Sequence, residues 1–307
     1  MQRNVATLSG YKQLKGKIRY RLTNDYMFRA VMQKNKNVLK HLICALLSMQ
    51  VDEVKDLTIQ NPIELGKEID SKTCILDIKI LLNNNQIINI EMQVAKQDYW
   101  KERSLTYLCR TYDNLESGKE YNEVTPAIQI CILDFDLFND VEELFSKYYL
   151  TNENSDYRNH YTEGFAIFVL NLQQIYNPKV IEAEGETELY QWAKLFKAES
   201  WEELCMLAEQ NEVFDDCATT LAQLTEDEKL RMQLDARNDY IARQKGLVSR
   251  VTKEVTEQVT EQVTKQVTKE VRVEIARNLL DVLDVSIISE RTGLTVEEIE
   301  KLKKEIR

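Results

Sequence analysis

The sequence predicts a mixed α/β fold, a sheet flanked by helices, with a helical stalk and a small helix-turn-helix-like unit after it. Apolar residues at helical spacing alternate with strand-like apolar runs through most of the chain. Two of those runs are joined by three asparagines, Asn83 to Asn85, which favour a hairpin turn. A four-residue repeat begins at Val251 and favours a long helix. Alternating patterns of this kind are typical of a sheet with helices packed on it.

Each element of the sheet domain follows from the local pattern. A first helix is expected within residues 26–50, with Thr23 or Asn24 as its N-cap, because apolar side chains recur there every three or four residues. Residues 140–162 are polar and are expected to be looped or partly helical. The later expected elements are strands at 74–82, 87–95, 127–134 and 165–172, and helices at about 99–116 and within 188–242.

Composition argues against several classes of protein. The chain of 307 residues has a net charge of −11, which disfavours a general nucleic-acid coat protein. Its six cysteines form no C-x-x-C pair and its two histidines are too few for a His-rich metal site, so we expect reduced thiols in a cytoplasmic protein. No apolar run approaches the roughly 20 residues that span a bilayer, and the N-terminus has no signal-peptide core, so no membrane partner is expected.

Residues 1–24 are basic although the whole chain is acidic. They contain no acid, and their cations could neutralise phosphates or could belong to a solvated tail. We therefore expect a basic arm over 1–24, followed by the sheet domain over 25–245. The cations are Arg3, Lys12, Lys15, Lys17, Arg19 and Arg21.

The C-terminal part divides into a repeat and a compact unit. Residues 246–274 carry the repeat VTKE VTEQ VTEQ VTKQ VTKE, whose valine stripe advances about 40° per repeat around a helix. Such a stripe favours right-handed pairing, so we expect a helical linker that joins copies of the chain; a spacer grown by duplication is the alternative. Residues 275–307 predict a small packing or dimer module, in which Thr295 begins a capping box with Glu298. Acidic residues at the start of its last helix disfavour a DNA-reading role.

The hairpin carries the candidate chemistry. Pairing symmetric about Asn84 places Asp77 opposite Glu91, on the same face as Lys79 and Gln93. Opposed residues hold their Cβ atoms about 5 Å apart, so the two carboxylates repel unless a cation lies between them. Mg²⁺ suits such a pair, because it takes oxygen ligands and keeps waters for a phosphate substrate. The alternative is a solvated face on which Lys79 neutralises the acids without a metal.

A stripe on the following helix suits nucleic acid. Trp100, Arg103, Tyr107 and Arg110 fall on one helical face. Arginine and aromatic side chains together favour contacts to phosphates and bases. Alternatively, the aromatic residues belong to the core and the arginines pair with nearby acids.

Short motifs spread over roughly residues 20–240 match a known family. The motifs are Asn24-Asp25-Tyr26-Met27-Phe28, Leu76-Asp77-Ile78, Ile90-Glu91-Met92-Gln93, Glu102-Arg103 with Tyr107, Gly118-Lys119-Glu120-Tyr121 and Leu133-Asp134-Phe135. Together they resemble the PD-(D/E)XK nuclease family transposases, also called recombination-promoting nucleases. The four-residue repeats and the TGLTVEEI ending are similar to C-termini common in that family. The resemblance implies a restriction-endonuclease-like core, a twisted sheet flanked by helices.

The resemblance also implies a site and a cofactor. Asp77 and Glu91-x-Gln93 match the family's paired acids, with Gln93 in the position of the lysine, and Asp25 matches an upstream acid. Asp77 and Glu91 are then expected to bind Mg²⁺ or another divalent cation, and Gln93 to orient a water. Lys79 could supply the missing cation. A competing frame takes Asp70 as the first acid and Asp77-x-Lys79 as the second motif, but it leaves Glu91 without a role.

The leading interpretation is a metal-dependent DNA endonuclease associated with recombination or a mobile element. DNA contacts are expected from Arg103, Tyr107 and Arg110. Two alternatives stay open. One is a degenerate nuclease fold that binds DNA without cutting it, and the other is a self-assembling scaffold or regulatory protein built on the valine stalk.

Overall fold

A computed structural model describes residues 10–60, 63–64, 74–75, 77–138, 140–153 and 159–305. The chain divides into two compact units, Met1–Met232 and Gln233–Arg307, whereas the sequence predicts the end of the sheet domain near residue 245.

A six-stranded mixed sheet forms the centre of the first unit. Strands β5, β6 and β8 are parallel to one another, and β1, β4 and β7 pair antiparallel to their neighbours. The strands β1 and β7 are absent from the sequence-based expectation, because their short runs lack a clear apolar alternation. In spatial order the strands are β1 (Leu57–Gln60), β4 (Ile78–Leu82), β5 (Gln86–Gln93), β6 (Ala127–Leu133), β8 (Phe165–Asn171) and β7 (Phe145–Tyr149).

The β4–β5 hairpin has the expected register. Lys79 pairs with Asn89, and the turn comprises the three asparagines after Leu82. Asn83 and Asn84 both have positive φ, 49° and 56°, a backbone conformation that asparagine tolerates better than most residues. The Asn83 side chain accepts hydrogen bonds from the backbone N–H groups of Lys55 and Asp56, which fixes the turn against the segment before β1.

The predicted strand 74–82 is too long. Its first residues, Cys74–Ile75 (β3), pair instead with Ile63–Glu64 (β2) in a separate two-stranded sheet. Ile75 therefore does not face Gln93 as the symmetric pairing would require. The backbone bends at Asp77 before β4 begins, so this carboxylate lies just beyond the end of the β4–β5 ladder.

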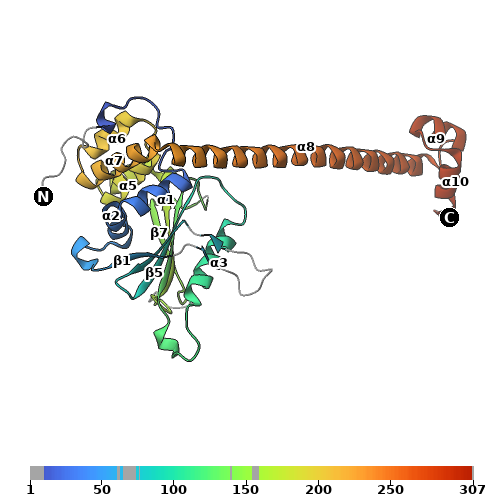
Figure 1. Ribbon diagram of the computed structural model, residues 1–307. Helices are drawn as coiled ribbons and strands as arrows, with labels where there is room; N and C mark the ends of the chain where they lie inside the picture. Colours follow the sequence, from blue (N-terminus) through green and yellow to red (C-terminus); the bar gives the residue numbers. More distant parts are fainter. Residues whose placement is uncertain are drawn as a thin grey trace. The chain divides into compact units, whose positions relative to one another are not determined.

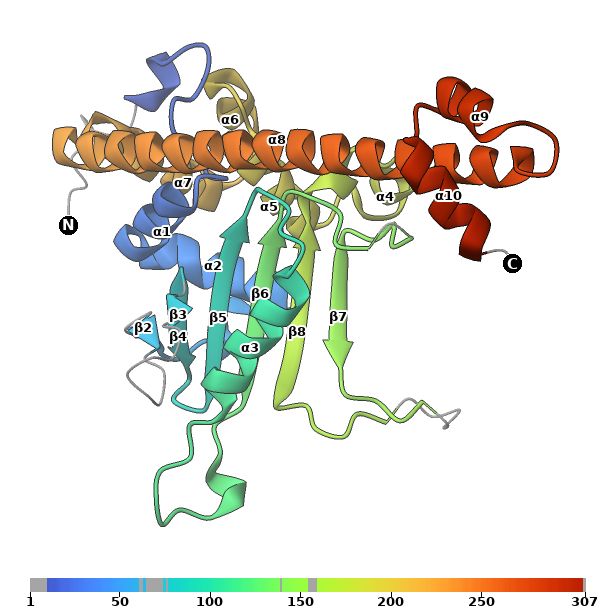
Figure 2. The same ribbon diagram turned by 90° about the vertical axis from the view of Figure 1, so that its right-hand side faces the viewer.

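Helices α1 (Asp25–Lys34), α2 (Lys36–Leu47) and α5 (Glu188–Lys197) cover one face of the sheet (Figures 1 and 2). The single helix expected within 26–50 is interrupted at Asn35, which ends α1 and caps α2 by accepting the Val38 N–H at 3.2 Å. The even-numbered β5 residues point to this face and are buried with it; they are Ile88, Ile90 and Met92.

Helix α3 (Trp100–Tyr112) covers the opposite face, in front of β5 and β6 in Figure 2. Trp100 is buried there among Cys131, Leu133 and Val169. The polar face of the hairpin is therefore covered by a helix, and Asn89 and Glu91 on it are 0% and 2% exposed. Both faces of β5 are interior.

The remaining helices of the first unit pack around the N-terminal segment. Tyr11, Ile18, Tyr20 and Leu22 are buried, and Lys12 pairs with Asp215 on α7 at 3.1 Å. Residues 10–24 thus belong to the packed unit, with their cations at least partly paired, and Arg3 lies outside the described residues. The other elements are η2 (Tyr11–Gln13), η3 (Val51–Glu53), η4 (Tyr121–Glu123), η5 (Leu172–Tyr176), α4 (Pro178–Glu184), α6 (Trp201–Ala208) and α7 (Glu212–Glu226).

The second unit consists of most of α8 (Glu228–Leu279), then α9 (Val285–Thr292) and α10 (Val296–Glu305). The valine repeats are helical throughout, as the pattern predicts. Helices α9 and α10 fold against the end of α8 around a small core of Ala276, Ile288, Leu294, Ile299 and Leu302. The capping box is present, since the Thr295 Oγ1 accepts the Glu298 N–H and the Glu298 carboxylate accepts the Thr295 N–H. No helix in the described part of the chain could span a bilayer.

Candidate functional site

Three acids from different elements approach one another beside β5. Asp77 follows the bend before β4, and its Oδ2 accepts the backbone N–H of Met92 at 2.8 Å. Glu91 lies on β5, one residue before that N–H, and Asp25 begins α1 after the Asn24 N-cap. The charges of Asp77 and Asp25 both disfavour ionisation of Glu91. The fold therefore brings Asp77 and Asp25 near enough to Glu91 for their charges to act on it.

Arg103 on α3 reaches the innermost of these acids. Its Nη2 lies 2.6 Å from Glu91 Oε1, and the side chains of the pair are 27% and 3% exposed. The same guanidinium donates from Nη1 to Gln97 and from Nε to the Tyr107 hydroxyl, and it lies over the Trp100 and Tyr107 rings. Pairing of the α3 arginines with nearby acids is the alternative that the sequence leaves open. Arg103 does pair with an acid, but that acid lies on the sheet and not on the helix.

The second carboxylate oxygen of Glu91 is buried without a hydrogen-bond partner. The pKa of Glu91 is raised to about 8: burial is the largest cause, the Arg103 guanidinium opposes it, and the charges of Asp77 and Asp25 add to it. An unpartnered buried acceptor is costly, on the order of 1–3 kcal/mol, so it commonly marks a functional group or an absent ligand. Among the acids beside β5, Glu91 is therefore the strongest candidate for a metal-binding or catalytic residue.

Gln93 and Lys79 flank the acids. Gln93 ends β5, half-buried, and its Nε2 donates to the Ala95 carbonyl at 3.0 Å. That bond orients the amide and leaves its oxygen able to accept a hydrogen bond from water. Lys79 is half-buried on β4, opposite Asn89. Asp70, the first acid of the competing frame, lies outside the described residues.

The predicted helical stripe divides by burial. Trp100 is 1% exposed and belongs to the core, whereas Tyr107 and Arg110 are half-buried farther along α3. Arg103 lies between them with its guanidinium on Glu91. Sequence periodicity alone places all four residues on one face, and packing then separates a core aromatic from the polar remainder.

Sequence reasoning missed a second ion pair near the carboxyl ends of the parallel strands. Lys197 on α5 lies 2.8 Å from Asp134, which follows β6, and their side chains are only 13% and 8% exposed. Gln173 donates to the same carboxylate, and the Asp134 N–H donates to the Gln93 carbonyl. Polar residues directly after parallel strands could have indicated this position, because those ends meet at one edge of the sheet.

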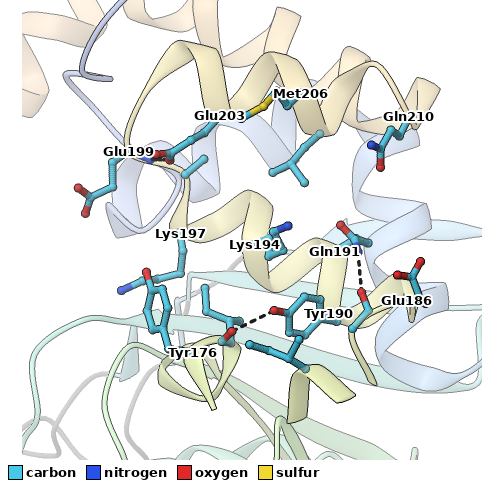
Figure 3. A pocket seen from close by; sticks show the side chains of 15 residues that line it. Tyr176, Glu186, Tyr190, Gln191, Lys194, Lys197, Glu199, Glu203, Met206 and Gln210 are labelled. Atoms are coloured by element: carbon cyan, nitrogen blue, oxygen red, sulfur yellow. Dashed lines mark hydrogen bonds between the residues drawn. The ribbon is translucent and has the colours of Figure 1, made fainter. Parts of the chain in front are cut away.

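A cavity of about 820 Å³ lies away from the acids, between η5, α4, α5 and α6 (Figure 3). Its walls are held by the hydrogen bonds from Tyr190 to the Ile175 carbonyl and from Gln191 to the Gly185 carbonyl. Asp77 and Glu91 do not line it. Within the described residues, no three His, Cys, Asp or Glu side chains already form a metal-binding group.

A family model described as PD-(D/E)XK nuclease family transposase matches residues 22–250, well over half of the chain. No curated protein and no solved structure matches significantly. The matched region contains the sheet, the flanking helices and the three acids, and its fold is restriction-endonuclease-like.

Proposed function

This chain belongs to the PD-(D/E)XK nuclease family transposases, and we propose that it is a metal-dependent DNA endonuclease of a mobile element or recombination system. A nuclease of this family implies DNA as the substrate, and such nucleases generally use divalent metal ions. The observation that carries the proposal is the buried, unpartnered oxygen of Glu91 beside Asp77.

The donor set fits a divalent cation. Asp77 and Glu91 offer carboxylate oxygens, the ligands that Mg²⁺ prefers, and one oxygen of Glu91 still lacks a partner. The charges of Asp77 and Asp25, which raise the pKa of Glu91, also favour a cation beside that carboxylate. A bound Mg²⁺ would lower the pKa of a water and stabilise charge on the phosphate.

The chain's own residues would prepare the attack on the phosphodiester. Gln93 accepts a hydrogen bond from the attacking water and orients it, but an amide cannot take its proton. Lys79, on the same face of the hairpin, supplies positive charge in place of the missing lysine. Asp25 adds negative charge at the start of α1. Arg103 opposes the effect of burial on the pKa of Glu91, and its 2.6 Å contact fixes the direction of that side chain.

DNA contacts would come from the outer part of α3. Tyr107 and Arg110 offer a ring and a guanidinium for base and phosphate contacts. Arg103 donates to Glu91, Gln97 and Tyr107, which leaves two of its five N–H groups for a phosphate. We place the protein in the cytoplasm, with reduced thiols, and expect copies to associate through α8.

Cleavage of supercoiled plasmid DNA tests the proposal. We expect nicking that requires Mg²⁺ or Mn²⁺ and falls by more than about 100-fold in Asp77→Asn and in Glu91→Gln, since even indirect partners of a metal ligand cost 10–100-fold. The nicking rate of Arg103→Lys should fall about 10-fold, because a lysine cannot donate to Glu91 and Tyr107 at the same time in the way the planar guanidinium does.

Glu102→Gln is the matched control for Glu91→Gln, because Glu102 is exposed on α3 next to Arg103. It should nick like the unaltered chain. Nicking that survives unchanged in both Asp77→Asn and Glu91→Gln would contradict the assignment of the site.

Binding of DNA without cleavage is a second candidate function. Two observations favour it: glutamine stands in the lysine position, and Arg103 already neutralises Glu91. The same assay separates the two functions. A degenerate nuclease fold would slow the migration of plasmid in gel-shift experiments and would leave the DNA uncut at every metal concentration.

A further inference from the structure

The second unit contains a cleft whose walls are rich in cations. It has a volume of about 410 Å³ and lies between the last turns of α8 and the turn that joins α9 to α10. Lys265, Lys269 and Arg272 follow one another at helical spacing along the α8 wall. All three side chains are exposed. The other lining residues are Thr264, Thr268, Gly293, Leu294 and Glu298.

The opposite wall is a tight turn held by the small core. Gly293 has φ +71°, the left-handed conformation that ends α9, and a Cβ built on it would lie 3.7 Å from the Arg272 guanidinium. Leu294, the next residue, is buried in the core with Ala276. The turn is therefore fixed against α8, with the Arg272 guanidinium close to Gly293.

The acids near the cleft are already engaged. The Glu298 carboxylate accepts the Thr295 N–H at 2.9 Å and its hydroxyl at 3.0 Å, as part of the capping box. Glu261 pairs with Lys265 at 2.6 Å, but both side chains are more than 60% exposed, and such solvent-exposed pairs contribute little to stability. A multiply charged anion can displace so weak a partner.

The cleft also faces away from the valine stripe. Lys265 lies two residues after Val263, about 200° around the helix, and Lys269 stands in the same relation to Val267. Association of α8 through the valines would leave the cationic wall accessible. Beside the cleft, the valines and the two lysines therefore lie on different sides of the helix, whereas the same row carries Glu257 and Glu261 in the preceding repeats.

We propose that this cleft binds phosphate groups of a duplex DNA backbone. The inference rests on the proposed function for the choice of DNA as the polyanion. Lysine and arginine contact phosphates without reading bases, so the cleft would hold the substrate non-specifically while cleavage takes place at the acids beside β5.

Salt-dependent binding of a labelled duplex to the full-length protein tests the cleft. The triple variant Lys265→Gln, Lys269→Gln, Arg272→Gln should weaken binding by at least about tenfold at low salt. It should reduce the slope of log affinity against log salt by about two to three, for two unrelated DNA sequences alike. The triple variant Lys253→Gln, Arg277→Gln, Arg291→Gln makes the same change of charge on exposed residues of this unit outside the cleft. It should bind DNA as the unaltered chain does.

Two further measurements test whether the glutamine variant is folded and whether the positive charge itself is what binds DNA. Circular dichroism should show unchanged helicity, and Lys265→Arg with Lys269→Arg should retain the salt slope, since it keeps both charges. If the glutamine triple variant keeps the salt dependence of the unaltered chain, the cleft does not bind DNA phosphates, even if plasmid nicking persists. If Asp77→Asn loses nicking but keeps the salt dependence of DNA binding, the cleavage site and the binding cleft are separate, as proposed. If the triple variant loses binding only to vesicles that contain phosphatidylserine, the ligand is a lipid surface and the proposal is wrong.

Discussion

Glu91 experiences opposing influences that determine how its site can work. Burial and the charges of Asp77 and Asp25 favour its protonated form, and the Arg103 guanidinium at 2.6 Å favours the carboxylate. Burial is the largest of these effects, so the pKa of Glu91 is raised. A divalent cation would need the ionised form, and binding it should therefore release a proton near neutral pH.

The raised pKa predicts how stability depends on pH. Because the pKa rises from its usual 4.5 to about 8 in the folded chain, the fold favours protonated Glu91. This contribution to the free energy of unfolding is fully present below pH 4.5 and is lost as the pH rises through 8. In metal-free buffer, urea unfolding of Glu91→Gln should lose this part of the pH dependence.

The control for that measurement is Glu102→Gln, which should keep the pH dependence of the unaltered chain. If Glu91→Gln and the unaltered chain show parallel curves between pH 5 and 9, Glu91 is ionised throughout and Arg103 outweighs burial. The same Glu91 ionisation predicts that affinity for Mn²⁺ increases up to about pH 8 and then levels off.

At the scale of single elements, helix α8 presents an unusual surface. Its valines recur every four residues from Val251 to Val271, and each is 46–54% exposed. A row spaced by four residues is one of the ridges by which helices pack at an angle. Because the row advances around the helix, two straight helices can share only its central part, near Val259 and Val263.

This geometry predicts how α8 associates. Val259→Gln with Val263→Gln should shift sedimentation velocity profiles toward the monomer, because two half-exposed apolar side chains leave the centre of the contact. Glu257→Gln with Glu261→Gln places the same side chain about 200° away and should leave the profile unchanged. A monomeric unaltered chain at all concentrations would contradict association through α8.

At the scale of the whole molecule, the chain separates cleavage chemistry from a possible second contact with DNA. The acids and the sheet belong to the unit that ends at Met232, and the cationic cleft belongs to the unit that begins at Gln233. Linking two weak sites raises the effective concentration of DNA at each. The whole chain should therefore bind DNA more tightly than either unit.

Removal of residues 246–307 tests this division. The shortened chain should stay folded, because the buried helices and the sheet lie in the first unit, and it should still nick plasmid at low salt. Its DNA affinity should fall by tenfold or more, and nicking should become more sensitive to salt. Complete loss of nicking at low salt, with Asp77→Asn silent in the full chain, would favour the scaffold interpretation.

Local periodicity allowed much of the fold to be predicted. The hairpin register follows from strand alternation around three asparagines, and the Val-Thr repeats and the Thr295 capping box specify helices by nearest neighbours alone. Residues of the candidate site could be selected for the same reason, because Asp77, Glu91 and Gln93 interrupt apolar strands. These signals depend on residues a few positions apart, and the sequence by itself contains them.

Tertiary structure decided the features that depend on distant partners. The hairpin's polar face could have been solvated, but α3 covers it, and only that packing buries Glu91 and brings Arg103 onto it. In the same way Lys12 meets Asp215, so residues 10–24 join the first unit instead of forming an arm. Alternation determines which residues share a face of a strand, but the element that covers that face is chosen by packing across the whole domain.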